Sequence, residues 1–408
     1  MSLGHDVAVR LWRRGYDALG RERDAHGGGD VFACRLLGRR AVVVRGADGA
    51  RAFYDEDVVE RHGAVPAPLA GLLFGHGAVH GLDGEAHRER KRIFLGVLTP
   101  DAVADIAQRV RADLERRAGA WRGRDVALFD ELAEAYGTAM VAWAGIDCPP
   151  AEARGMARRM AAIVDGFGGA PAAYPKAWVA RLRGNRWARR LVQDVRAGRR
   201  SAAPGTAVAR LAASDLPATV AGVELLNLVR PTVAVAWPAT FAALALAQHP
   251  EWRERLRHDA DQRVAFVHEV RRVYPFAPAL AGRARRSAEV GGELLGRGER
   301  LVLDIVGTNL DPAAWPDPEA FRPERFARRE PDPFAFVPQG GGDPRTGHRC
   351  PGEPLTVRLM AETVGVLAAV GYDVFSSPAY DRERIPTRPA DGLVIRVSTS
   401  EAAGTRRR

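Results

Sequence analysis

The sequence predicts a mainly helical fold with a minor β component, and three observations support this. From residue 49 onward, apolar side chains recur at helical spacing, whereas strand-like runs are few and short. The order of these segments is not the strand–helix alternation of a doubly wound sheet. No repeat of about 20–50 residues is visible, which argues against a solenoid. The 408 residues are 46% hydrophobic, enough for a sizeable core.

The predicted elements run from a small sheet into a long series of helices. Residues 31–44 (VFACRLLGRRAVVV) predict two short strands joined by a turn at Gly38. Pro250 predicts that one helix ends and the next one starts there. Strand-like patches return at 301–306 and 394–398. The helices are expected at 102–121, 129–144, 151–167, 187–197, 222–247, 251–274 and 355–370.

The formal charge of +10 raises the question of nucleic-acid binding. Nearly all of the positive charge is arginine, with lysine only at positions 91 and 176, and it is scattered over predicted helical faces. The sequence contains no helix-turn-helix, zinc-finger or ribonucleoprotein pattern. We therefore expect no nucleic-acid partner, and the arginine-rich segment 404–408 is interpreted as a frayed tail.

Cysteine spacing and apolar segments indicate a cytoplasmic protein without a stable membrane anchor. Cys34, Cys148 and Cys350 do not form the even, closely spaced framework of a disulfide-bonded secreted protein. The N-terminus is charged and does not resemble a secretory signal. The longest apolar stretch, 231–247, is interrupted by Pro238, so it predicts a buried core helix rather than a membrane span of about 20 apolar residues.

The segment 336–353 (FVPQGGGDPRTGHRCPGE) carries the strongest functional signal. Cys350 falls just before the predicted helix 355–370, where free N–H groups favour a thiolate over a thiol. The alternative is a buried structural cysteine after a flexible loop. Glycines in such a loop let the backbone pack tightly against a flat ligand. These glycines are Gly340, Gly341, Gly342 and Gly347.

Two companion motifs precede this loop: EVRR at 269–272 and FRPERF at 321–326. With these three motifs in this order, the whole chain, 1–408, resembles the cytochrome P450 superfamily as a single haem-thiolate domain. The resemblance implies that haem b lies between the long central helix and the Cys loop, with its iron held by the sulfur of Cys350. It also implies that the Glu–Arg pair of the first motif interlocks with Arg322 or Arg325.

Two departures from ordinary members of the superfamily narrow the resemblance. Most members have Phe seven residues and Gly four residues before the Cys, where this chain has Asp343 and Thr346. The longer loop resembles the bacterial fatty-acid peroxygenase branch. The central helix reads NLVRPTVAVA at 227–236 and lacks the acid–alcohol pair with which monooxygenases deliver protons to dioxygen.

In place of that pair the helix carries Arg230 and Pro231. A guanidinium inside so apolar a helix needs an anion, because an unpaired buried charge is costly. Arginine binds carboxylates bidentately, and the proline bends the helix and opens space. We expect a fatty-acid carboxylate at Arg230. The alternatives are that Arg230 reaches the surface or pairs with Glu224, whose spacing is wrong for a pair within one helix.

The segment 73–84 (LFGHGAVHGLDG) also resembles the peroxygenase branch. The resemblance implies that Phe74 lines the substrate channel and that His80 lies beside the distal face of the haem. A histidine there is associated with decarboxylation as well as α-hydroxylation. Histidine can donate or relay protons near neutral pH, so a catalytic role is plausible, and hydrogen bonding to the haem edge is the alternative.

Further residues are expected at the edge of the haem and in the substrate cavity. His87 and Lys91 lie on one face of the next predicted helix, which in the family meets the haem propionates. The alternative is a solvated basic face. Arg61 is a further propionate candidate by resemblance, and Phe276 is expected to line the substrate cavity.

The resemblance and Arg230 together predict a peroxygenase that uses hydrogen peroxide to hydroxylate fatty acids at the α or β carbon or to decarboxylate them to terminal alkenes. The substrate carboxylate, held by Arg230, would act as general acid and base, so no redox partner is obligatory. The alternatives are a redox-partner-dependent monooxygenase, a non-catalytic haem-based fatty-acid sensor and a peroxygenase for another carboxylate.

Overall fold

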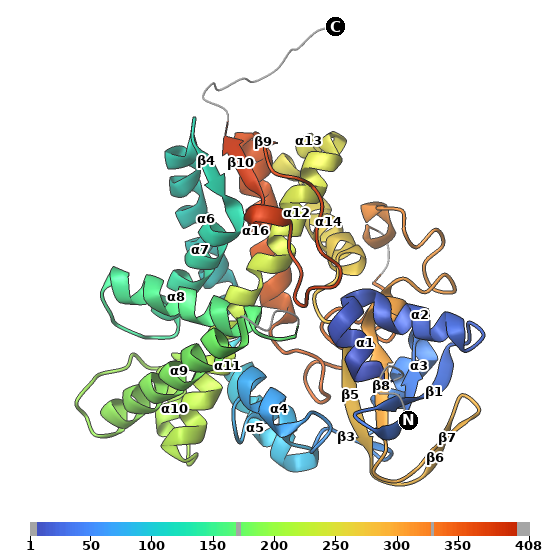
Figure 1. Cartoon of the computed structure of the whole chain (residues 1–408). Coiled ribbons are helices and arrows are strands. Elements are labelled where there is room, and N and C mark those ends of the chain that lie inside the picture. The colour runs from blue at the N-terminus through green and yellow to red at the C-terminus, as the bar shows by residue number, and fades with distance from the viewer. Residues whose placement is uncertain (1–5, 169–172, 328–329, 398–408) are drawn as a thin grey trace, which may run out of the picture.

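A small sheet with its flanking helices forms one side of the molecule, and a larger group of helices forms the other (Figure 1). The computed structural model describes residues 6–168, 173–327 and 330–397. The predicted mainly helical fold with minor sheet is confirmed. The α-helices are α1 (Val7–Arg14), α2 (Ala18–Ala25), α3 (Gly46–Phe53), α4 (Ala67–Leu73), α5 (Gly84–Val97), α6 (Pro100–Trp121), α7 (Leu128–Trp143), α8 (Pro150–Asp165), α9 (Ala173–Arg196), α10 (Ala207–Ala213), α11 (Ala218–Ala234), α12 (Ala236–Gln248), α13 (Arg253–His258), α14 (Ala260–Val273), α15 (Ile305–Asn309) and α16 (Glu353–Val370).

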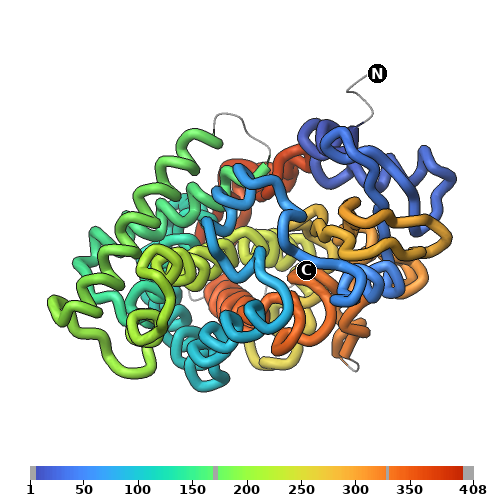
Figure 2. Tube along the Cα trace, turned by 90° about the horizontal axis from the view of Figure 1, so that it is seen from below, coloured from blue at the N-terminus to red at the C-terminus, as the bar shows by residue number. Residues whose placement is uncertain are grey.

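Within the described residues the strands form three small sheets with the orders β1-β2-β8-β5-β3, β4-β10-β9 and β6-β7. In the largest sheet β2 and β8 are parallel, with Ala41 opposite Arg300, and the other neighbours are antiparallel. In Figure 2 the blue chain segment that contains β1 and β2 lies beside the orange segment that contains β5 and β8. The strands are β1 (Val31–Leu36), β2 (Arg39–Val44), β3 (Val59–Glu60), β4 (Asp125–Ala127), β5 (Ala279–Ala284), β6 (Ala288–Val290), β7 (Glu293–Leu295), β8 (Arg300–Asp304), β9 (Tyr372–Val374) and β10 (Val394–Val397).

The predicted hairpin around Gly38 is confirmed. Leu37 and Gly38 both have positive φ, 53° and 76°, as a tight two-residue turn between antiparallel strands requires. The Asp6 carboxylate accepts the Leu37 N–H at 2.9 Å and the Gly38 N–H at 2.6 Å, which fixes the turn. The strand predicted at 301–306 is shorter, because the Asp304 side chain accepts the Gly307 N–H and starts α15.

The predicted central helix consists of two helices, α11 and α12, separated at Val235. Pro231 lies inside α11, and the helix continues for three more residues before it ends. The segment Ala218–Gln248 is long and apolar enough to cross a membrane, but 89% of its most apolar window is buried inside the molecule. It therefore has the burial of a core helix, as the sequence predicted. Helix α16 packs against α6, α12 and α14 beside it.

Other boundaries differ from the predictions. The helix expected at 187–197 already begins at Ala173, as part of α9. The helix expected at 251–274 is divided, because the Asp259 side chain accepts two N–H groups and starts α14. Strands β3 to β7 and β9 are two to six residues long and carry no clear alternation, so the sequence did not reveal them. The predicted tail at 404–408 and residue 398 lie outside the described residues.

Candidate active site

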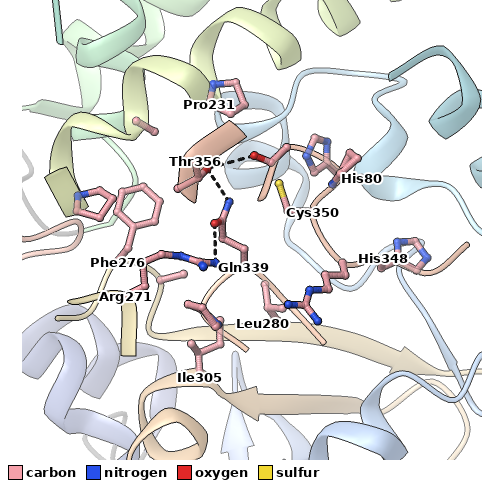
Figure 3. Close-up of a pocket in the computed structure, with 18 of the residues that line it drawn as sticks. His80, Pro231, Arg271, Phe276, Leu280, Ile305, Gln339, His348, Cys350 and Thr356 are labelled. Carbon is pink, nitrogen blue, oxygen red and sulfur yellow. Dashed lines mark hydrogen bonds between the residues drawn. The ribbon is translucent and has the colours of Figure 1, made fainter. Parts of the chain in front are cut away.

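Four of the predicted site segments meet around one cavity with a volume of about 370 Å³. Its walls come from residues 74–80, α5, α11, residues 271–280 and residues 338–356. We call the wall made by 338–356 the cysteine side, and the wall made by 74–80 and α11 the distal side. In Figure 3 the sulfur of Cys350 points toward the side on which Pro231 and His80 lie. The fold thus places the predicted sulfur ligand and the predicted carboxylate site on one cavity.

The Cys350 thiol lies at the end of the loop, three residues before α16 begins. Its backbone N–H donates to the carbonyl of Gln339 at 3.1 Å, which closes the loop on itself. Burial raises the pKa of the Cys350 thiol, although the Gly352 N–H and Lys91 act in the opposite direction. The Gly352 N–H, next to the start of α16, thus acts in the predicted direction, but burial has the larger effect. Binding to a metal ion would supply the missing stabilisation of the thiolate.

Side chains of α14 and α16 hold the cysteine loop in place through hydrogen bonds and ion pairs. The Gln339 side chain accepts from Arg271 at 2.9 Å and donates to Thr356 at 3.1 Å (Figure 3). Glu353 forms ion pairs with Arg271 and with Arg349. Because each of these groups has a partner, the loop is rigidly positioned before any ligand binds.

The glycines of the loop do not all face the cavity, contrary to the prediction. Gly340 lines the cavity, with φ +97°, and a side chain there would come 2.6 Å from the Tyr54 hydroxyl. Gly341 packs against the same Tyr54, and Gly342 packs against Phe334. A side chain at Gly347 would meet only the Asp343 carbonyl. Most of these glycines therefore serve packing of the loop on its neighbours rather than contact with a flat ligand.

The first companion motif forms a buried ion pair. Glu269 and Arg272 are both fully buried and joined by two hydrogen bonds of 2.7 Å. Arg272 also donates to the carbonyls of Asn309, Pro318 and Ala320. These bonds fix the segment before the Cys loop to α14.

The structure decides between the two predicted partners of this pair. The guanidinium of Arg325 lies 3.5 Å from the Glu269 carboxylate. Arg322 contributes only its backbone N–H, at 2.7 Å, while its side chain pairs with Asp317. Arg325 is thus the guanidinium that joins the network.

On the distal side, Arg230 is 5% exposed and lines the cavity beside Pro231. Its guanidinium lies 5.6 Å from the centre of the Phe167 ring and makes no hydrogen bond or ion pair with the described residues. Burial, together with the charge of Arg181, lowers the pKa of Arg230 to about 9. Arg230 therefore does not reach the surface, which excludes one of the alternatives.

Glu224, the other alternative for Arg230, is engaged elsewhere. One of its oxygens accepts from the Val79 N–H at 2.8 Å and from Arg90 at 2.7 Å. The other accepts from Asn227 at 3.0 Å. Arg230 thus remains a buried cation without a carboxylate partner in the described part of the chain.

Phe74 and His80 line the cavity as predicted, with their rings stacked 4.2 Å apart. Burial lowers the pKa of His80 to about 3, and the charge of Arg230 acts in the same direction. Burial thus favours the neutral imidazole near pH 7, and a proton-transfer role of His80 stays a prediction. A neutral imidazole can still donate one hydrogen bond into the cavity.

At the edge of the cavity, the ring of His87 stacks on that of His348 at 3.9 Å. Burial lowers the pKa of His87 to about 3, and its predicted contact with a haem propionate stays a prediction. The Lys91 ammonium donates to the carbonyls of Gly347 and Arg349. Both side chains are buried, which rules out a solvated basic face.

The two remaining candidates differ in position. Phe276 lines the cavity, as predicted. Arg61 lies outside the lining, with its guanidinium 3.9 Å from the centre of the Phe53 ring. One buried nitrogen of Arg61 has no hydrogen-bond partner among the described residues, and Arg61 acts electrostatically on His348. Its role at a propionate stays a prediction.

Several residues of the site were missed from the sequence. Gln339 and Arg271 hold the loop, His348 stacks on His87, and Asn227 donates to the Phe74 carbonyl at 3.0 Å. All four lie within the motifs discussed above, which was the available signal. Their roles depend on contacts between segments distant in sequence, which the motifs do not encode.

The cavity fits a haem group. A buried thiol projects from one wall, the interior carries many apolar side chains, and polar groups gather at one edge. That edge presents His87, His348 and Arg349, whose nitrogens suit the two carboxylates of a haem. These residues and Cys350 are the ones that would hold it.

Comparison with known proteins agrees with this geometry. The profile of the family described as Cytochrome P450 matches residues 232–361. Dimethylnonatriene synthase from Arabidopsis thaliana is 39% identical over 101 residues, 24% of this chain and 19% of the relative. A putative cytochrome P450 137 from Mycobacterium tuberculosis is 32% identical over 148 residues, 35% of this chain and 30% of the relative. The chain thus spans under a third of these curated relatives.

Solved structures match over nearly the full length. Cytochrome P450SP alpha (CYP152B1) in complex with (R)-ibuprophen is 38% identical, with a TM-score of 0.91, and the match covers 96% of this chain and 98% of that one. Ligand-free cytochrome P450 OleT is 32% identical, with a TM-score of 0.93, and the match covers 99% of both chains. A variant of OleT in complex with arachidonic acid is 31% identical, with a TM-score of 0.93, over 99% of this chain and 98% of that one. With both the fold and the sequence matched from end to end, the chain belongs to the cytochrome P450 family.

Proposed function

We propose that the protein is a haem-thiolate peroxygenase that uses hydrogen peroxide to oxidise fatty acids at the α or β carbon, or to decarboxylate them. The observation that carries this proposal is Arg230, a buried guanidinium without a carboxylate partner, on the same cavity as Cys350. A ligand carboxylate is the group that such a cation lacks. The compartment we propose is the cytoplasm, consistent with three cysteines that are all free.

The bound ligands of the related structures support this substrate class. (R)-Ibuprophen and arachidonic acid, bound in CYP152B1 and in an OleT variant, are both carboxylic acids with a large apolar body. The cavity of this chain combines the same two requirements. Arg230 supplies the cation, while Phe74, Phe167 and Phe276 supply apolar walls.

The mechanism assigns each step to a residue of this chain or to the substrate. Haem b, which Cys350 would hold, would supply the activation of the O–O bond. Arg230 binds the substrate carboxylate through two parallel hydrogen bonds, which fixes the α and β carbons near the centre of the cavity. The carboxylate accepts a proton from hydrogen peroxide and returns it to the departing oxygen, so it serves as general base and then as general acid.

The neighbouring residues set the conditions for this step. Pro231 interrupts the hydrogen bonding of α11 next to Arg230 and widens the cavity there. Neutral His80 donates a hydrogen bond from the distal side and orients the peroxide or the carboxylate. The aromatic walls exclude water, which strengthens the interaction between the guanidinium and the carboxylate.

The test is turnover of the haem-loaded protein with hydrogen peroxide and a series of fatty acids, with products identified by mass spectrometry. We expect α- or β-hydroxy acids or terminal alkenes without any reductase. Arg230→Met should abolish turnover while the haem spectrum stays intact, and the exposed Arg186→Met is the matched control. Turnover only with a reductase and dioxygen would identify a conventional monooxygenase. Spectral binding without any product would identify a sensor.

A further inference from the structure

A second buried arginine lies near the distal side. Arg181 belongs to α9 and is 0% exposed, and it ranks among the largest fully buried side chains. All three of its guanidinium nitrogens lack a hydrogen-bond partner, and no carboxylate lies within 4 Å, in the part of the chain that the structure describes. A full positive charge is thus buried without direct compensation, which is costly in a folded protein.

The guanidinium of Arg181 lies directly behind the cavity wall. It packs on Gly75, which has φ +87°, and a side chain at Gly75 would come 2.0 Å from a nitrogen of Arg181. Gly75 follows Phe74, which lines the cavity and whose carbonyl accepts from Asn227, another lining residue. Arg181 therefore lies against the backbone of the residue that follows Phe74 on the distal side.

The nearest acidic side chain does not neutralise Arg181. Glu224 attracts Arg181 electrostatically but does not contact it. Both Glu224 oxygens are occupied, since Arg90 and the Val79 N–H bind one of them and Asn227 binds the other. Arg90 and Glu224 form an ion pair of zero net charge. One uncompensated charge thus remains at Arg181, and a second remains at Arg230.

The two unpaired charges act on the same region. After burial, the charge of Arg181 is the next cause that lowers the pKa of Arg230, and it also lowers the pKa of His80. The guanidinium charges of Arg230 and Arg181 therefore both contribute to the positive potential at the carboxylate site. An anion bound at Arg230 relieves the repulsion between them as well as the cost of burying each of them.

We propose that Arg181 is a second determinant of specificity for carboxylate substrates, acting through the wall at Gly75 without touching the substrate. This inference rests on the proposed binding of a carboxylate at Arg230. Arg181 makes the site select an ionised head group, so that a fatty acid binds in preference to the alcohol or ester of the same chain length. Its charge matters for this effect, whereas the planar geometry of its guanidinium does not.

The test compares dodecanoate with 1-dodecanol on the haem-loaded protein, with binding followed by the change in haem absorbance. Arg181→Met should weaken dodecanoate binding about tenfold, the order expected for one unit charge acting through a buried wall. Binding of 1-dodecanol should not change. Arg181→Lys keeps the charge and should restore most of the affinity. In turnover with hydrogen peroxide, Arg181→Met should raise KM for dodecanoate and leave kcat nearly unchanged.

Each outcome decides the inference. It is overturned if Arg181→Met weakens both ligands equally or neither of them, or if Arg181→Lys fails to restore binding. The exposed Arg186→Met, on the same helix, controls for the loss of a positive charge in general. If Arg181→Met loses its haem spectrum, Arg181→Gln takes its place with the same expected results. A wild-type protein that binds 1-dodecanol as tightly as dodecanoate would instead refute the carboxylate site at Arg230.

Discussion

The buried charges beside the cavity are paired on the cysteine side, whereas on the distal side, within the described chain, Glu224 is paired and Arg230 is not. On the cysteine side and in the adjoining helix α14, Glu353, Arg271, Glu269 and Arg272 all have partners within hydrogen-bonding distance. On the distal side, Arg230 has none among the described residues. A buried charge that is fully paired holds a structure together, whereas one that is left unpaired is stabilised only by what binds next to it. The difference separates residues that build the site from residues that await a ligand.

The largest expected effect comes from removing one partner of the buried ion pair in α14. Glu269→Ala leaves the fully buried Arg272 without its carboxylate, and we expect the free energy of unfolding to fall by about 3–5 kcal/mol. Urea unfolding followed by circular dichroism measures this loss. Glu254→Ala removes an exposed ion pair with Arg257 and is the matched control, with an expected change of at most about 1 kcal/mol. Equal losses in the two variants would mean that the buried pair does not stabilise the fold.

The next effect is stabilisation of the folded protein by a carboxylate bound at the unpaired Arg230. Dodecanoate at about 100 times its Kd should stabilise the folded protein by about 2.7 kcal/mol. The added protection from hydrogen exchange should concentrate in α11 and at the Val79 N–H, which is bonded to Glu224 on the distal side. Amides of the Cys loop should gain less, because their network is already complete. Protection spread evenly over both sides would contradict the distinction between them.

A smaller effect separates charge from geometry on the distal side. Arg230→Lys keeps the positive charge but loses the planar pair of donors. We expect kcat/KM for dodecanoate to fall about tenfold, and the ratio of α to β products to change, because a single ammonium holds the carboxylate less firmly. Product ratios from mass spectrometry measure both effects. Wild-type kcat/KM and product ratio in Arg230→Lys would show that charge alone positions the substrate.

Sequence reasoning was most successful where residues act within a local motif. Cys350, Arg230, Phe74, His80 and Phe276 were all predicted to surround one cavity, and the structure brings them together there. The order of the motifs predicts that these residues share a cavity. Each motif indicates a local structure, and the fold of the family determines how those local structures meet.

Protonation and long-range pairing could not be predicted in the same way. His80 was expected to donate or relay protons near neutral pH, and His87 to meet the propionates, but no sequence pattern indicated that burial lowers the pKa of each to about 3. The isolation of Arg181 also depends on how α9 packs against Gly75, which is distant in sequence. Burial and tertiary neighbours determine both properties, and no spacing along the chain reports them.

The effect that is smallest per pH unit tests whether neutral His268 in α14 supports the network next to the cysteine side. His268 accepts a hydrogen bond from Arg271 at 3.0 Å, and burial, with the charge of Arg271, lowers the pKa of His268 to about 3. Below about pH 6.5 the imidazole gains a proton in the unfolded chain but not in the folded protein. The folded protein therefore becomes less stable as the pH is lowered. The free energy of unfolding of wild type should therefore decrease, relative to His268→Gln, by on the order of 1 kcal/mol per pH unit between pH 6 and 4. Urea unfolding at several pH values measures this difference, with the exposed His258→Gln as control. The difference in unfolding free energy between wild type and His268→Gln could instead stay constant with pH. That result would mean that His268 is protonated in the folded protein as well, so that an unpaired charge is tolerated next to the cysteine side.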